Sequence, residues 1–550
     1  MSDTIQLDDL SIRPSFERAL KSVHPAIGVV DDRAYIGVWI PCQIESVDKQ
    51  GNSKTVEKDL LFLITDKHEK ILANDQVLLE RGWRLAYKPI QFENRWSLDD
   101  VKTFLTEDSS VIDPLQVLEH VVNAWTTYLE LPSPDQYSYE ALWDIGTYFY
   151  HLFNCYPYDY KGGPKRTGKS KALTVSSCLS FNAIFSNNMS VSSIYRLIQN
   201  ARCTLLIDET EKLRNPERAQ EFRSILLAGY KRGEKVYRVE KNSKEKLVPE
   251  GFEVYAPKRL ANIGGLEDVL EDRCVVSFLR RSINRAVVDR EINTSHPLWS
   301  ELRSELHRLY LGYWREIQAC YCKLSELSEA NELVNFLRTT TKDVSEEDFE
   351  YLTARELELW KPILALAIFF DSKGSLHPSK FTCSLSSLTS CIIKLAVDHA
   401  KQKQTENITE IGELILIQTL LKTVSKDGYY KVKTVKDDMA ASFDEEQNWL
   451  TTKWIGNALR RLGFKEKRRV GTGYEYKLNV DAVRDLAERM QIEEVDRASV
   501  AGTETSEGTQ QSNKLPCEVC GSHDAKMHLI PNKGVRWLCD RCLESYPGKI

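Results

Sequence analysis

The sequence predicts a multidomain protein of the α/β class, for three reasons. The chain has 550 residues, which is too long for one hydrophobic core and corresponds to about three to five domains of ordinary size. Apolar segments with helical and strand periodicity alternate from residue 150 to residue 281, as a sheet covered by helices requires. Two polar stretches, 399–407 and 493–514, separate the remaining parts of the chain.

The composition is that of an ordinary globular protein. Hydrophobic residues make up 42% and charged residues 28% of the chain. No apolar run approaches the roughly 20 residues that a membrane span needs, and the acidic start lacks the apolar segment of a secretory signal. We therefore expect an intracellular protein without a membrane partner. The net charge of −6 excludes a protein that coats nucleic acid and leaves only local basic patches for such contacts.

The coarse periodicity suggests how the chain is divided. Residues 1–110 form a predicted β-rich N-terminal domain, because short apolar runs between 34 and 105 alternate with turn-like stretches. Residues 111–290 form the α/β core with its leading helices at 112–160. Residues 291–400 are a helical region with amphipathic periodicity. We assign no functional motif in the first 110 residues.

A glycine-rich loop carries the strongest chemical signal. Residues 163–170 (GPKRTGKS) fit the pattern G-x-x-x-x-G-K-[ST] at every specified position. Glycines let successive backbone N–H groups point at phosphate oxygens, and the helix that follows directs its positive end at the same anion. The competing interpretation is a chance glycine-rich turn. The predicted ATP-binding loop consists of Gly163, Pro164, Lys165, Arg166, Thr167, Gly168, Lys169 and Ser170, with Lys169 on the β- and γ-phosphates and Ser170 on Mg²⁺.

An acidic strand follows this loop. Residues 203–207 (CTLLI) are apolar, as in a buried parallel strand, and end at Asp208 and Glu209. The carboxyl edge of such a sheet is where ligand-binding groups lie. Asp208 is predicted to hold Mg²⁺, and Glu209 to activate the attacking water as general base. The alternative is an acidic turn that caps the next helix.

Two further polar residues extend the predicted site. A third strand is expected at 252–256, leading to Asn262, which would orient the water from the sensor-one position. An Asn that only satisfies its turn is the alternative. Arg273 is a candidate arginine finger that acts on the nucleotide of a neighbouring subunit. A salt bridge from Arg273 to Asp272 or Asp268 is the competing interpretation.

These motifs carry a family resemblance. Residues from about 143 to 281, with GPKRTGKS, LLIDE, LAN and EDR in this order, resemble the AAA+ ATPase core of phage, plasmid and archaeal replication proteins. The segment is similar to superfamily-three helicases and minichromosome-maintenance ATPases. The resemblance implies a homo-oligomer, a hexameric ring, that binds DNA near the nucleoid in the cytoplasm and acts as a replicative helicase or initiator, including those of mobile elements. The alternative function is an ATP-dependent assembly switch or DNA-bound regulator that unwinds nothing.

A basic hairpin is the first predicted DNA contact. Residues 235–255 read as two strands joined by a polar tip that carries Lys241, Lys244 and Lys246. In the families named above, a hairpin in this position projects into the ring channel. Ammonium groups on such a lever would contact phosphates. An ordinary solvated hairpin, with lysines that discourage aggregation, is the alternative.

Residues 408–490 resemble a winged-helix domain. Two predicted helices precede a third at about 450–463, which starts at the capping pair Thr451 and Thr452. A basic hairpin follows it as the wing. A helix of this type enters the major groove, and a basic wing contacts phosphates. A winged helix that binds protein is the alternative. The predicted DNA-contacting residues are Lys453, Arg460, Arg461, Arg468 and Arg469.

A cysteine module closes the chain after a flexible linker at 491–515. Residues 516–550 contain two C-x-x-C pairs, the spacing of a structural zinc ribbon. The module is too small to bury a core, so Zn²⁺ would supply its folding energy. Its partner, DNA or protein, stays open. The predicted zinc ligands are Cys517, Cys520, Cys539 and Cys542.

Overall fold

The computed structural model divides the chain into two compact units, residues 1–400 and 401–550. Within the described residues, every helix is too short or too polar to span a lipid bilayer. The structure describes residues 5–7, 10–12, 20–47, 53–91, 95–106, 112–163, 166–185, 190–208, 216–241, 247–261, 268–327, 330–341, 343–345, 347–374, 385, 387–441, 450–471, 473–489, 526–530, 534–538 and 541.

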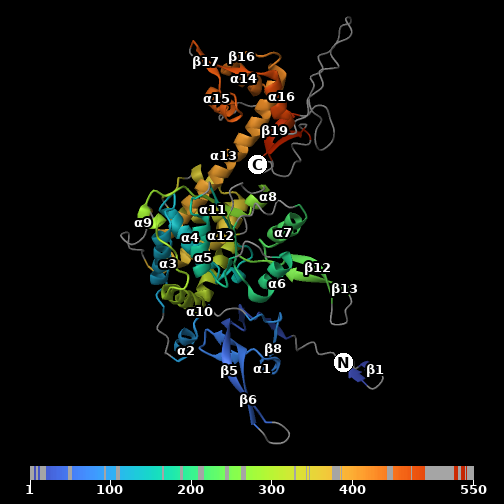
Figure 1. Cartoon of the computed structure of the whole chain (residues 1–550), viewed down its shortest axis with the longest axis vertical. Coiled ribbons are helices and arrows are strands. Elements are labelled where there is room, and N and C mark those ends of the chain that lie inside the picture. The colour runs from blue at the N-terminus through green and yellow to red at the C-terminus, as the bar shows by residue number, and fades with distance from the viewer. Residues whose placement is uncertain are drawn as a thin grey trace. The chain divides into compact units, whose positions relative to one another are not determined.

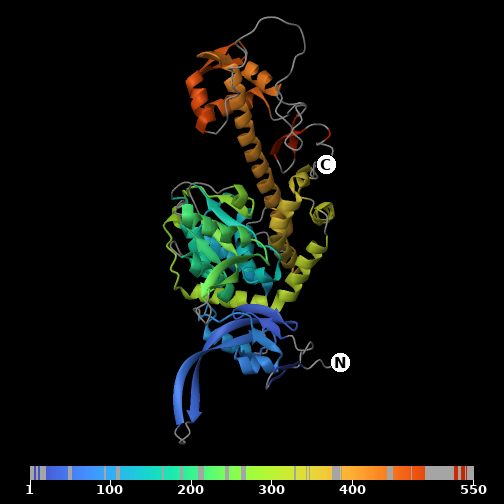
Figure 2. The ribbon, with the colours of Figure 1, turned by 90° about the vertical axis from the view of Figure 1, so that its right-hand side faces the viewer.

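The N-terminal part of the first unit is mainly β, as expected. Its principal sheet is antiparallel, with the order β4-β5-β6-β7. Strands β5 and β6 pair from Tyr35↔Thr65 to Val47↔Ser53 and extend well beyond the rest of this part (Figure 2). Two short helices also occur, and Asn74 caps the first of them by accepting from Gln76 N at 2.8 Å. The elements are β1 (Ile5–Leu7), β2 (Leu10–Ile12), β3 (Lys21–Val23), β4 (Ile27–Val30), β5 (Arg33–Val47), β6 (Ser53–Thr65), β7 (Lys70–Leu72), α1 (Asp75–Glu80), β8 (Trp83–Leu85) and α2 (Leu98–Thr106).

A five-stranded parallel sheet forms the α/β core, with the order β10-β11-β14-β9-β15. The carboxyl ends of all five strands therefore lie at one edge, the usual place of a ligand in such a sheet. Its strands are β9 (Tyr158–Gly162), β10 (Ile184–Phe185), β11 (Leu205–Ile207), β14 (Lys258–Ala261) and β15 (Cys274–Phe278). The other elements of the core are α3 (Pro114–Tyr128), α4 (Asp135–Gly146), η1 (Tyr150–Leu152), α5 (Lys169–Leu179), α6 (Val191–Ala201), α7 (Pro216–Ala228), β12 (Lys235–Lys241), β13 (Leu247–Glu253), α8 (Asp268–Glu271) and α9 (Arg285–Val288).

The expected third strand at 252–256 is wrong in position. Phe252 belongs to the antiparallel strand β13, residues 254–257 connect it to the sheet, and the parallel strand is β14. Lys258 and Arg259 begin this strand, and two adjacent cations argue against a buried strand in sequence analysis. Both side chains are nevertheless fully buried.

The hairpin β12–β13 projects from the side of the core, as the sequence predicted (Figure 1). Its root is fastened to helix α6 and to the N-terminal part. Glu253 N donates to Gln199 Oε1 at 3.0 Å, and Tyr87 OH donates to Glu253 Oε2 at 3.1 Å. His24 Nε2 lies 2.8 Å from the backbone oxygen of Gln199. These bonds connect the N-terminal part to the hairpin through the end of α6.

Long helices complete the first unit and confirm the predicted helical region. Helix α10 packs on α12 and α3, and its buried face includes Trp299 and Trp314. Pro362 lies inside α12, which is buried on most sides. These helices share one hydrophobic core with the parallel sheet. The elements are α10 (Pro297–Glu326), α11 (Ala330–Thr340), η3 (Glu347–Tyr351) and α12 (Ala354–Ser372).

Helix α13 (Leu388–Thr423) runs through the polar stretch 399–407 that was expected to separate two domains. The two helices predicted on either side of this stretch are therefore one. The stretch contains neither Gly nor Pro, and its Lys, Gln and Glu residues have good helix propensity. Polarity alone does not end a helix. The boundary between the two compact units nevertheless falls here, after Ala400.

The second unit contains the elements expected for 408–490, in the expected order. A core that includes Leu416, Val435, Ile455 and Leu478 joins its helices to a three-stranded sheet with the order β16-β18-β17. Thr451 caps the third helix by accepting from Trp454 N at 3.1 Å. A further antiparallel hairpin, β19–β20, lies in the cysteine module. The elements are β16 (Gly428–Lys431), α14 (Val432–Ala440), α15 (Thr452–Arg461), β17 (Lys467–Val470), β18 (Gly473–Leu478), α16 (Val480–Arg489), β19 (Lys526–Ile530) and β20 (Gly534–Leu538).

Candidate functional site

The glycine-rich loop leaves strand β9 at the carboxyl edge of the sheet and enters helix α5. Gly163, Arg166 and Gly168 have φ angles of 127°, 65° and 92°, in the left-handed region. A Cβ atom at Gly163 would lie 2.5 Å from the backbone oxygen of Leu279, so only glycine fits there. The backbone thus turns sharply between strand and helix, as an anion-binding loop requires. Pro164 and Lys165 lie outside the described residues.

Lys169 stands at the first position of helix α5. Its side chain is 8% exposed, and its Nζ donates to the backbone oxygen of Gly163 at 2.6 Å. The helix is preceded by Gly168, which has no side chain to cap its first N–H groups. Backbone N–H groups and a lysine at one helix terminus make a suitable environment for phosphate.

The loop and the acidic strand meet as predicted. Ser170 Oγ donates to Asp208 Oδ2 at 2.5 Å, and Asp208 directly follows β11. A hydroxyl and a carboxylate side by side offer the oxygen ligands that Mg²⁺ prefers. Lys169 is the neighbour of Ser170 in the chain, so the lysine and the acid belong to one site. Glu209 lies outside the described residues.

The two remaining residues of the predicted site are Asn262 and Arg273. Strand β14 lies between β11 and β9 and ends beside the loop, but Asn262, the next residue, is outside the described residues. Arg273 precedes β15, whose register runs from Cys274↔Tyr158 to Phe278↔Gly162. Arg273 is therefore at the amino edge, away from the loop. Arg273 therefore does not face the nucleotide loop of its own chain. Its predicted role in a neighbouring subunit and the competing interpretation, a salt bridge to Asp272 or Asp268, both stay predictions.

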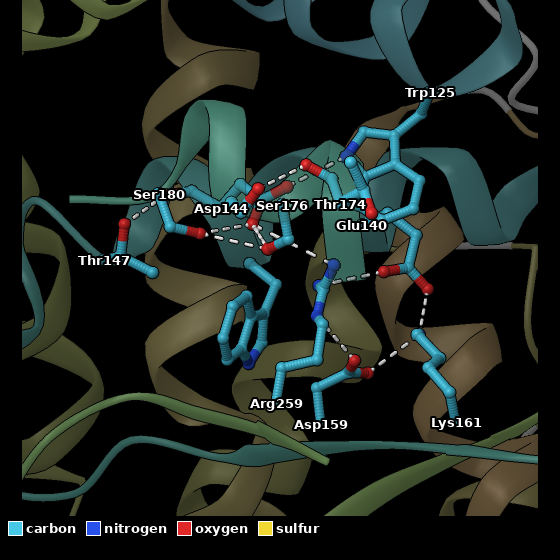
Figure 3. Close-up of polar contacts among 12 residues, drawn as sticks. Trp125, Glu140, Asp144, Thr147, Asp159, Lys161, Thr174, Ser176, Ser180 and Arg259 are labelled. Atoms are coloured by element: carbon cyan, nitrogen blue, oxygen red, sulfur yellow. Dashed lines mark hydrogen bonds and ion pairs between the residues drawn. The ribbon is translucent and has the colours of Figure 1, made fainter. Parts of the chain in front are cut away.

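A fully buried network of charged side chains lies beside the loop (Figure 3). This network was not predicted from the sequence. Arg259 faces Glu140 with Nη2 at 2.9 Å and Asp159 with Nε at 2.7 Å. These distances define ion pairs, but the N–H groups of Arg259 are not aligned with the carboxylate oxygens well enough to form hydrogen bonds. Lys161 pairs with Glu140 and, at 2.9 Å, with Asp159. Strands β9 and β14 are thus tied to helix α4.

Asp144 extends the network to the helix that follows the loop. It accepts hydrogen bonds from Ser176, from Ser180 Oγ at 2.7 Å and from Trp125 Nε1 at 3.0 Å. Burial raises the pKa of Asp144, although Arg259 and these donors act in the opposite direction. The network therefore joins the loop's strand, the loop's helix and the strand that leads to Asn262.

The guanidinium of Arg259 is the centre of this network. It lies over the rings of Trp143 and Trp125, with centroids at 4.2 and 5.0 Å. Burial disfavours its charge, but the carboxylates of Asp159, Asp144 and Glu140 outweigh burial, and the pKa of Arg259 is raised. A sequence signal existed: Asp159 and Lys161 place two opposite charges on one face of an otherwise apolar strand.

Lys258 points to the other face of the sheet and has a different environment. Its Nζ donates to the backbone oxygens of Gly229, Val254 and Ala256 at 3.2, 3.1 and 3.1 Å. It also lies 4.8 Å from the ring centroid of Tyr158. Burial lowers the pKa of Lys258 to about 7. This lysine joins the end of helix α7 to the chain between the hairpin and β14.

The predicted DNA-contacting residues have different surroundings. Lys241 ends strand β12, whereas Lys244 and Lys246 lie outside the described residues. In the second unit, Arg461 Nε donates to Glu413 at 2.6 Å, and Arg468 pairs with Glu475 at 2.8 Å. Three further side chains of the predicted set are exposed, and no acidic side chain among the described residues forms an ion pair with them: Lys453, Arg460 and Arg469.

The predicted zinc ligands Cys517, Cys520, Cys539 and Cys542 lie outside the described residues. Strands β19 and β20 form an antiparallel pair between the two cysteine pairs. Among the residues that the structure describes, no group of three or more His, Cys, Asp or Glu side chains is arranged to hold a metal ion.

Comparisons with known proteins give distant similarities only. No protein-family model matches the chain, and no curated protein sequence matches it. Among solved structures, the chain is similar to the active helicase Cch of SCCmec type IV, with 12% identity and a TM-score of 0.34 over 85% of this chain and 100% of that chain. It is also similar to a full-length MCM homologue from Methanopyrus kandleri, with 12% identity and a TM-score of 0.32 over 67% and 78% of the two chains. NtrX from Brucella abortus, in complex with ATP, gives 10% identity and a TM-score of 0.17 over 70% and 79%. Similarities of this size assign no role to any residue.

Proposed function

We propose that the chain is a Mg²⁺-dependent ATPase of the AAA+ type that assembles into a ring and translocates DNA, as a replicative helicase or initiator. One observation carries the proposal: Ser170, beside Lys169 at the start of α5, contacts Asp208 at 2.5 Å. The loop pattern and the acidic strand were recognised separately in the sequence. Their meeting at the carboxyl edge of a parallel sheet is the arrangement that phosphoryl transfer needs.

The chain's own groups have separate tasks in this proposal. Lys169 exchanges the oxygen of Gly163 for phosphate oxygens, because a charge-assisted bond to an anion is stronger than one to a carbonyl. Ser170 and Asp208 hold Mg²⁺, which neutralises charge on the phosphates when bound. Glu209 removes a proton from the attacking water, and Asn262 orients that water. Arg273 completes the site of a neighbouring subunit.

DNA would be bound by two regions. The hairpin β12–β13 projects from the core and carries Lys241, Lys244 and Lys246 at and beyond the end of β12. The winged-helix-like second unit presents α15 and β17, where the exposed arginines Arg461 and Arg468 pair with less exposed carboxylates and could also contact phosphates. Both regions bind phosphate, so their affinity should fall steeply with salt.

We further propose that the four terminal cysteines hold one structural Zn²⁺ around the hairpin β19–β20. Metal analysis of the purified protein should find about one zinc per chain. Cys539→Ser should reduce the content to near none, because three remaining ligands bind the ion weakly. A zinc-free wild-type protein would contradict this part.

The enzymatic proposal is tested by ATP turnover and strand displacement. Lys169→Ala should abolish nucleotide binding, and Glu209→Gln should lower turnover by about 10²- to 10⁴-fold while DNA binding is retained. Both variants should fail to unwind a duplex. Lys102→Ala, a change at an exposed lysine of α2, is the matched control and should behave as wild type.

Two outcomes would change the proposal. Wild-type protein that hydrolyses ATP but neither responds to DNA nor unwinds it is an assembly switch or regulator, not a helicase. Failure of wild type to bind labelled ATP removes the ATPase proposal altogether. The mass of the ATP-bound assembly gives the ring size.

A further inference from the structure

The hairpin β12–β13 has two unlike faces, because side chains alternate along its paired strands. One face rests on helix α6. There the ring of Phe252 lies 4.3 Å from that of Tyr195, and Arg196 pairs with Glu240 at 2.6 Å. This face of the hairpin therefore packs against the protein's own helix α6.

The opposite face carries apolar side chains that stay exposed. Tyr237 and Val239 are 67% and 66% exposed, and Leu247 on the partner strand is 68% exposed. The register Tyr237↔Gly251 places Tyr237 opposite a glycine. Three large apolar side chains that are two-thirds exposed on one short hairpin are costly unless they contact a partner.

Gly251 determines how the ring of Tyr237 lies. A Cβ atom at Gly251 would be 2.8 Å from Tyr237 Cε1, so the ring occupies the space that a side chain would need. An aromatic ring that covers a strand glycine stabilises the pairing. That role uses only the part of the ring that touches the strand, and most of the ring remains open. The strand at Gly251 therefore supports one part of the Tyr237 ring and leaves the rest of the ring exposed.

A cation lies beside this ring. Lys235 is on the same face, and its Cδ would be 3.3 Å from the same Cβ position. The single acid on this face of the two strands, Glu253, is at the root and accepts from Tyr87. An open aromatic ring next to an ammonium group matches the two parts of a nucleotide in a single strand, its base and its phosphate.

We infer that Tyr237 is a stacking platform for a base of single-stranded DNA, with Lys235 at the adjoining phosphate. The inference rests on the proposed function and deepens it, since it assigns a base contact to the strand of the hairpin rather than to its lysine tip. The site takes any base, because every base has a π-face.

The test compares the binding of full-length protein to oligothymidylate and to an abasic strand of the same length. Wild type should prefer the strand with bases. Tyr237→Ala should weaken binding to oligothymidylate by about 5- to 150-fold, the usual range for loss of one stacked base. It should leave binding to the abasic strand and DNA-independent ATP turnover unchanged. Tyr237→Phe should retain the preference, and Val239→Ala, a truncation on the same face, should retain it too.

A second readout needs no variant. 2-Aminopurine in the bound strand loses fluorescence when it stacks, so wild type should quench it and Tyr237→Leu should not. If wild type binds both strands equally, or if Tyr237→Ala keeps the preference, the inference is wrong while the proposed function stands. If Tyr237→Ala keeps the preference and instead reduces the mass of the ATP-bound assembly, the face contacts a second copy of the chain. If wild type binds no single strand at all, the proposed DNA function fails as well.

Discussion

Two adjacent residues of strand β14 show two ways of burying a cation. Arg259 lies on one face of the sheet among three carboxylates and two tryptophan rings. Lys258 lies on the other face among three backbone oxygens. The pKa of Arg259 is raised and that of Lys258 is lowered to about 7, although both side chains are fully buried. Carbonyl dipoles satisfy the hydrogen bonds of an ammonium, but only opposite charge compensates for its desolvation.

We expect the largest loss of stability from the substitution Arg259→Met. The substitution leaves Glu140, Asp144 and Asp159 buried with Lys161 as the remaining cation, and unpaired buried charge costs about 3–5 kcal/mol of unfolding free energy. Chemical denaturation followed by tryptophan fluorescence measures this, since Trp125 and Trp143 flank the site. Arg461→Met, which removes an ion pair nearer the surface, should cost about 0–1 kcal/mol. Equal losses in the two variants would show that the network is not strongly coupled.

The pH dependence of folding stability tests the environment of Lys258. Its pKa is about 7 in the folded chain and 10.5 as the ordinary value. Between these values the unfolded chain binds more protons, so stability should rise with pH, by up to about 1.4 kcal/mol per pH unit. Below about pH 7 both states are protonated and this contribution is constant. Denaturation of wild type and Lys258→Met at several pH values gives the difference profile. Parallel profiles would mean that the lysine titrates normally.

The smallest expected effect is that of Ser180→Ala. Asp144 loses one donor but keeps Ser176 and Trp125, so the loss should be about 1 kcal/mol. The measurement is the same denaturation experiment. Ser46→Ala, at an exposed serine of β5, is the control and should change nothing measurable. A loss as large as that of Arg259→Met would place the main support of Asp144 on the serines rather than on the arginine.

The parts of the site that the sequence revealed are those with local patterns. The loop and Asp208 were predicted because a motif of eight residues and an apolar strand that ends in acids can each be recognised alone. In the structure Ser170 contacts Asp208. The nucleotide, magnesium, zinc and DNA roles of the predicted site residues stay predictions. The mainly β N-terminal part and the hairpin were also predicted correctly, because strand alternation and turn residues are local signals.

The parts that could not be predicted depend on distant partners. Nothing near Arg259 in the sequence indicates that Glu140 and Asp144 on helix α4 will surround it, so strand β14 was placed too early in the chain. No partner side chain in the sequence could have predicted the burial of Lys258, since its acceptors are backbone oxygens. Helix α13 runs through the polar stretch 399–407, which was predicted to separate two domains although its residues favour helix.

The fastening of the hairpin root has a mechanical consequence. A projecting pair of strands acts as a cantilever, and a load at its free end produces a large bending moment at the root. Glu253 supports the root and is held by Gln199 of helix α6 and by Tyr87 of the N-terminal part. The N-terminal part therefore stiffens the hairpin where stiffness has most effect, and a load on the tip is shared between the two.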